Sequence, residues 1–242
     1  MKSPELNVSY LNDLPTNHLR QGVRTCSRQS HGLIRLLAIS LAILPMLVAA
    51  QIVSNLGESN NNDGGVNSTA WNAASFTTGS NAGGYTLTSA TMLFGAATGS
   101  PSNFEARIFD NNSGEPGNIL GSLSGSSPST AGTHDFTTSG INLTANTTYF
   151  LVSTAEGASG NGFENRFTSS TSETSSDGWA IGDAFIFSND QGTTWHNLGA
   201  EVMMFSISAT PVPEPHEYAM LVGLGLMGFV VARRHLVSKA LT

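Results

Sequence analysis

The chain has 242 residues, 39% of them hydrophobic and only 11% charged, and residues 51–215 hold fourteen acidic side chains, two arginines and no lysine. Binding to phosphates needs clustered basic side chains, so this acidic stretch, with a formal charge of −12, argues against nucleic acid or an anionic membrane as a partner. The composition indicates instead a solvated acidic surface on one domain of ordinary size.

Residues 1–50 have the layout of a secretory signal peptide. A long leader with four arginines precedes an apolar run that ends at Ala50. Val48 and Ala50 supply the small side chains that signal cleavage requires, so we predict a cut between Ala50 and Gln51. An anchor that stays uncut is the alternative. The polar, glycine-containing segment 51–69 is predicted to be a flexible linker.

Residues 70–210 are predicted to form an all-β domain. Short segments rich in β-branched and aromatic residues alternate with Gly, Asn and Pro turns, and no amphipathic helix of ten or more residues lies between them. The strand candidates are 71–78, 85–94, 103–110, 147–154, 183–188 and 202–209. Many short strands of this kind predict an antiparallel, jelly-roll-like β-sandwich of about eight strands.

One loop of this domain offers oxygen ligands for calcium. The sequence DNNSGEPG (110–117) contains Asp110, Asn112 and Glu115, and carboxylate and amide oxygens suit Ca²⁺. The loop lacks the further acids of a complete calcium loop, so a polar hairpin turn is the favoured interpretation. No cofactor is expected. The only cysteine, Cys26, lies outside the domain, which excludes a cysteine-ligated zinc site within it.

The sequence SNDQGTTW (188–195) fits the S-x-D-x-G-x-T-W pattern and resembles the Asp-box of sialidases and related β-propellers. Asp190 can accept backbone N–H bonds, Gly192 can adopt a positive φ, and Trp195 can pack under the turn. The motif is structural in those proteins, and a single copy occurs in this chain. We therefore predict a β-hairpin turn rather than a catalytic centre.

A hydrolase could combine one of two histidines, His134 or His196, with an acid such as Asp135 and a serine. No G-x-S-x-G nucleophile motif occurs, and no spacing singles out a pair of carboxylates. We therefore predict that the protein is not an enzyme, with a glycan hydrolase as the least favoured alternative.

A carbohydrate-binding module is the other alternative. β-Sandwiches can bind sugars through exposed aromatic side chains. The candidate side chains are Trp71, Tyr85, Tyr149, Trp179 and Trp195. Burial in the core is the favoured interpretation for each of them.

The segment 211–236 has three parts in a fixed order. They are Pro213-Glu214-Pro215, an uncharged run over 218–232, and Arg233-Arg234. As a helix the uncharged run measures about 22 Å, which is shorter than a hydrocarbon core of about 30 Å. Snorkelling arginines can close that gap. The positive-inside rule then predicts that residues 237–242 form a cytoplasmic tail.

This three-part segment resembles the PEP-CTERM sorting signal. That signal occurs on exported proteins of Gram-negative bacteria that make extracellular polysaccharide, where an exosortase, a membrane-embedded transpeptidase, recognises Pro-Glu-Pro and removes the tail. The resemblance implies export across the inner membrane and a transient anchor through residues 218–232. It also implies delivery to the cell surface or extracellular matrix, in association with exopolysaccharide. A plain C-terminal anchor that stays is the alternative.

The order of features in the β domain is similar to that of exported choice-of-anchor domains, most closely type R. The segments that carry the resemblance are WNAASFTTG (71–79), ARIFDNNSGEPGNILGSLSG (106–125), LTANTTYFLV (143–152) and FIFSNDQGTTW (185–195). The resemblance covers about residues 71–210. It implies an exported β domain and carries over no catalytic residue.

Overall fold

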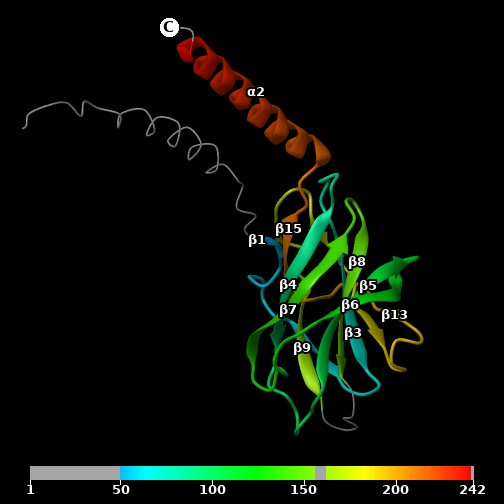
Figure 1. Cartoon of the computed structure of the whole chain (residues 1–242). Coiled ribbons are helices and arrows are strands. Elements are labelled where there is room, and N and C mark those ends of the chain that lie inside the picture. The colour runs from blue at the N-terminus through cyan, green and yellow to red at the C-terminus, as the bar shows by residue number, and fades with distance from the viewer. Residues whose placement is uncertain (1–49, 156–161, 241–242) are drawn as a thin grey trace, which may run out of the picture. The chain divides into compact units, whose positions relative to one another are not determined.

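The computed structural model describes residues 50–155 and 162–240 (Figure 1). These residues form two antiparallel β-sheets followed by one long helix. The predicted signal peptide lies outside the described residues, apart from Ala50.

The first sheet has eight strands, all paired antiparallel. Its main path is β10 (Thr174–Ser175), β1 (Ala50–Ser54), β15 (Phe205–Pro211), β4 (Tyr85–Phe94), β9 (Phe163–Thr168) and β14 (Val202–Met203). Two further strands lie off this path: β2 (Asn62–Val66) pairs with β9, and β7 (Gly132–Leu143) pairs with β4.

The second sheet has seven strands, also antiparallel. Its main path is β13 (His196–Asn197), β12 (Ile186–Ser188), β3 (Trp71–Thr77), β8 (Thr148–Ala155), β5 (Phe104–Asn112) and β6 (Glu115–Leu123). The short strand β11 (Ala180–Ile181) pairs with β3.

The two sheets share one apolar core. Side chains alternate between the two faces of a strand, so every second residue points inward. Phe76, Ile108 and Leu151 of the second sheet are fully buried, as are Leu87 and Ile207 of the first. All five belong to one continuous cluster, which means that the sheets face each other across it.

The six predicted strand segments all contribute strands, but two long strands were not predicted. Both β6 and β7 lie beside a single long neighbour, and each has only two buried residues. β6 also contains Pro116 and two glycines, which indicate turns in a sequence. Strands with so few buried residues lack the regular alternation that marks a strand in the sequence.

The prediction of a flexible linker over 51–69 is wrong. Within this segment β1 lies between β10 and β15, and β2 pairs with β9. Val53 and Val66 are completely buried in the core. Between the two strands, Asn55 Nδ2 donates to Met203 O (3.0 Å) and Asn55 Oδ1 accepts from Phe205 N (2.7 Å). The β domain therefore begins at β1 rather than at residue 70.

The final element is the helix α2 (Pro215–Ala240), 26 residues long, or about 39 Å. Pro215 suits the first helical position, because the N–H that proline lacks would have no partner there. Glu217 Oε2 accepts a hydrogen bond from Glu214 N (3.3 Å), which is one half of a capping box. Proline and a capping glutamate thus fix the start of the helix.

We expect Asn55→Ala to lower the free energy of unfolding by about 1–3 kcal/mol, because the Met203 carbonyl and the Phe205 amide both lose a buried partner. Asn60→Ala changes an exposed residue of the same segment and should alter the free energy of unfolding by no more than about 0.5 kcal/mol. Urea unfolding measures both variants. Equal stabilities would mean that this segment lies outside the cooperative fold.

Candidate functional site

The last strand, β15, ends at Pro211, and the Pro-Glu-Pro motif begins two residues later. Val212, the residue between them, is bonded to the β domain. Val212 N donates to Gly84 O (3.0 Å), and Val212 O accepts from Asn81 Nδ2 (3.0 Å). These bonds continue the pairing of β15 with β4, whose last pair is Pro211 with Tyr85. The ordered sheet therefore extends to the residue before Pro-Glu-Pro.

Asn81–Gly84 is a tight turn that its own residues specify. Gly84 N donates to Asn81 O (2.8 Å), and Asn81 Nδ2 donates to Gly84 O (2.6 Å). Asn at the first position and Gly at the fourth suit a type I turn, and Gly84 has a positive φ of 76°. A Cβ on Gly83 would collide with Val212 O. Asn81 N also donates to the hydroxyl of the buried Tyr85 (3.2 Å), which anchors the turn to the core.

The carboxylate of Glu214 has a partner on each oxygen. Oε1 accepts from Ala82 N (3.2 Å), within the turn, and Oε2 lies 3.0 Å from His216 Nδ1. The Glu214 side chain keeps only 28% of its area exposed. The central side chain of the Pro-Glu-Pro motif is therefore held against the β domain.

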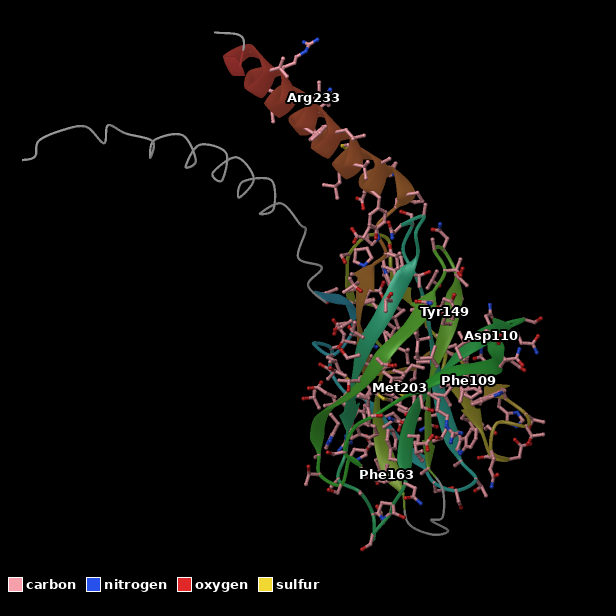
Figure 2. All side chains as sticks on the ribbon, in the orientation of Figure 1. Phe109, Asp110, Tyr149, Phe163, Met203 and Arg233 are labelled. Atoms are coloured by element: carbon pink, nitrogen blue, oxygen red, sulfur yellow. The ribbon has the colours of Figure 1, made fainter. Side chains whose placement is uncertain are left out.

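The helix α2 presents an apolar surface that the rest of the described chain leaves uncovered. By length and composition its segment Pro215–Arg234 can cross a membrane, and none of it is buried. Those 20 residues span about 30 Å, the thickness of a hydrocarbon core. Arg233 projects from the helix (Figure 2), and Arg234 is exposed next to it. The tail predicted over 237–242 is helical as far as Ala240.

The loop between β12 and β13 has the hydrogen bonds expected for the Asp-box sequence. Asp190 Oδ1 accepts from Thr194 N and from Ser188 Oγ, both at 2.8 Å, and Oδ2 accepts from Thr194 Oγ1 at 2.7 Å. Gln191 and Gly192 adopt positive φ values of 60° and 79°. The hydrogen bonds, above all that from the Thr194 side chain, lower the pKa of Asp190 from 3.8 to about 2.

Two tryptophans pack beside this loop on the outer face of the second sheet. Trp71 and Trp195 pack against a small apolar cluster that contains Phe150. A Cβ on Gly192 would lie 2.9 Å from Trp71 Cζ3 and 3.3 Å from Trp195 Cζ2, so only glycine fits. Arg107 Cζ lies 5.5 Å from the Trp71 ring centroid. Both indoles therefore pack against the hairpin. Asp190 and Gly192 stabilise its turn.

The other three aromatic candidates for sugar binding are buried. Trp179, Tyr85 and Tyr149 are 2%, 1% and 5% exposed and lie in the main core. Trp179 packs edge-on against Tyr85, with ring centroids 4.9 Å apart. The five predicted aromatic residues therefore form no common exposed face.

The calcium candidates lie on the β5–β6 hairpin, where Figure 2 labels Asp110. Both Asp110 oxygens already accept hydrogen bonds from Asn118, at 2.5 Å from its N–H and 3.1 Å from its side chain. Asn112 and Glu115 face each other as a cross-strand pair. Within the described residues, no three Asp, Glu, His or Cys side chains gather closely enough to hold a metal ion. Calcium binding stays a prediction.

Neither histidine of the β domain forms a catalytic pair with Asp135 among the described residues. His134 Nε2 lies 2.9 Å from Thr130 O, and Asp135 Oδ1 accepts from Thr91 Oγ1 (2.5 Å). Neighbouring residues of a strand point to opposite faces, so His134 and Asp135 point apart. His196 instead packs against an aromatic ring of β12, 5.2 Å between centroids.

The Asn81–Gly84 turn is the part of this site that sequence reasoning missed. The sequence SNAGGY does contain turn residues. Its contact with Val212, however, joins residues 131 positions apart. Only the pairing of β4 with β15 brings them together, and no local pattern encodes that pairing.

Comparison of the chain with protein-family models, with curated proteins and with solved structures finds no match. The resemblances to PEP-CTERM proteins and to choice-of-anchor domains therefore rest on the sequence motifs alone.

We expect the Asp190 carboxyl to titrate with a midpoint near 2. Thr194→Val removes the largest cause of this low pKa and should raise the midpoint toward 3.8. Thr193→Val removes only a bond to the backbone carbonyl oxygen of Asp190, so the midpoint of the Asp190 carboxyl should change little. Carbon-13 NMR of the carboxyl group measures the midpoint in each protein.

The sign of the pH effect follows from the lowered pKa. Because Asp190 binds its proton less tightly when folded, its contribution to stability is present above about pH 4 and is lost as the pH falls toward 2. A wild-type midpoint near 4 would contradict the hydrogen-bond network.

Proposed function

We propose that this protein is a non-enzymatic, exported surface protein whose C-terminal segment is a sorting signal. The signal peptide directs the chain across the inner membrane, and residues 218–232 anchor it there transiently. An exosortase-type transpeptidase then removes the tail at the Pro-Glu-Pro motif, and the β domain remains at the cell surface or in the matrix, associated with exopolysaccharide. The observation that carries the proposal is the uncovered apolar helix that begins at the motif itself.

Each part of the tail has a physical task in this proposal. Because α2 begins at Pro215, a membrane that holds the apolar helix also holds the motif near its surface. Arg233 and Arg234, at the other end of the apolar segment, favour the cytoplasmic side. Tail removal breaks one peptide bond and transfers the acyl group to an amine, which is transpeptidation, or to water, which is hydrolysis; in both cases the helix leaves with a new N-terminal amine.

The pairing of the first and last strands supports a precursor held by one membrane at both ends. β1 runs antiparallel to β15, and Ala50 lies opposite Ala209. The chain therefore enters and leaves the β domain at the same end of the sheet. The cut predicted between Ala50 and Gln51 falls at the start of β1.

The strand order supports a jelly-roll sandwich as the exported domain. Without the β2–β9 pair and the short strands β10 to β14, the remaining strands form two sets, β1-β15-β4-β7 and β3-β8-β5-β6. Numbered one to eight along the chain, these sets read 1-8-3-6 and 2-7-4-5, which is the order of a double Greek-key jelly roll. Jelly rolls serve many purposes, so this order supports a fold and specifies no activity.

We expect the protein from its native host to begin near Gln51 and to end near residues 213–215. Its intact mass and terminal peptides measure both ends, and additional mass would reveal attached glycan or lipid. Replacing Arg233 and Arg234 together by Gln should leave a larger fraction with the tail, because the cytoplasmic stop is weakened. Recovery of intact wild-type chains that retain residues 218–234 would indicate a permanent membrane anchor and refute the sorting function.

A further inference from the structure

We propose that the Asn81–Gly84 turn controls removal of the tail. The turn holds residues 212–214 against the β domain, and a membrane peptidase reaches the Pro-Glu-Pro motif only after the turn has released them. This inference rests on the proposed function, since it concerns the regulation of the same site.

Two separate contacts hold the segment, and both are made by this one turn. The backbone of Val212 is bonded through its N–H to Gly84 O and through its carbonyl to Asn81 Nδ2, each at 3.0 Å. The side chain of Glu214 accepts from Ala82 N at 3.2 Å. A displacement of the turn therefore breaks the backbone and side-chain contacts together.

These contacts occupy the groups that a peptidase uses to bind a substrate. An extended peptide is held through its backbone N–H and C=O groups and identified through its side chains. In the closed state Val212 has already used both backbone groups, and the Glu214 carboxylate is bonded to Ala82 and His216. The apparent affinity of the enzyme is then reduced in proportion to the open fraction of the substrate.

The turn can open without loss of the main fold. Ala82 and Gly83 are exposed, and a shallow hollow lined by Asn142, Leu143 and Val212 lies beside them. The hydrogen bond from Ala82 N to Glu214 is exposed, whereas Gly84 is buried. Exposed hydrogen bonds with few apolar contacts open at a lower free energy than the core. The hydrogen bond from Asn81 N to the hydroxyl of the buried Tyr85 and the burial of Gly84 keep the closed state populated.

Ala82→Pro is the most specific test. Proline is favoured at the second position of a type I turn, so the turn is preserved while the N–H that binds Glu214 is removed. Glu214 itself is unchanged. We expect tail removal in the native host to become about fivefold faster, the equilibrium factor for one lost hydrogen bond. Asn81→Ala, which frees Val212 O, should act in the same direction.

Asn142→Ala is the matched control, because it changes a residue of the same hollow that makes no hydrogen bond to Val212 or Glu214. Its rate should equal that of the wild type. Pulse-chase labelling with mass spectrometry of the C-terminal peptide gives the rate for each full-length chain. Thermal unfolding of each variant separates local opening from loss of the fold.

The possible outcomes separate this inference from the function on which it rests. If the tail is removed equally fast from wild type, Ala82→Pro and Asn81→Ala, the turn does not control processing, although the sorting function stands. If no chain loses its tail, the sorting function and the inference both fall. Amide hydrogen exchange at Val212 in the full chain adds an enzyme-free readout. It should be faster in Asn81→Ala, and unchanged exchange would overturn the inference.

Discussion

The burial of β15 between two partner strands is the constraint on which the rest of the molecule depends. Phe205 and Ile207 are fully buried, and the strand is paired with β1 on one side and β4 on the other. Buried backbone groups need partners, so neither half of this sheet is complete without β15. Pairing with β1 sets where the domain begins, and pairing with β4 brings Val212 to the Asn81–Gly84 turn. The β domain and the segment that leads into the Pro-Glu-Pro motif are thus one hydrogen-bonded unit.

The sequence predicted the fold where large apolar side chains alternate with polar ones, and failed where small or polar residues form the strand. Phe104, Ala106 and Ile108 alternate with polar residues in β5, so that strand was evident. β2 reads NDGGV, which suggests a flexible segment. Gly64 is there for close packing instead, because a Cβ would come within 2.5 Å of the Phe167 ring. Composition distinguishes flexible glycine from packed glycine poorly, since both lack a side chain.

In the candidate site, too, the features that depend on neighbouring residues were predictable, and those that depend on residues far apart in the sequence were not. The Asp190 turn was predictable because the hydrogen bonds of the Asp190 carboxylate and of the Ser188 hydroxyl join residues at most four positions apart. The order of Pro-Glu-Pro, apolar run and arginines was likewise readable from the sequence, although α2 is longer than the run over 218–232 and begins at Pro215. The contact between Glu214 and Ala82 was not, because it joins residues 132 positions apart through the tertiary fold.

The position of β15 also sets how the domain responds to mechanical load. While α2 is fixed in a membrane, a pull on it acts along β15, and drag on the domain opposes it. Since β15 is bonded to β1 and to β4, this force shears two ladders at once rather than opening one bond after another. Forced unfolding is governed by the unfolding rate constant and not by equilibrium stability. While α2 is fixed in a membrane, unfolding of the domain by flow is therefore limited by a rate and not by equilibrium stability.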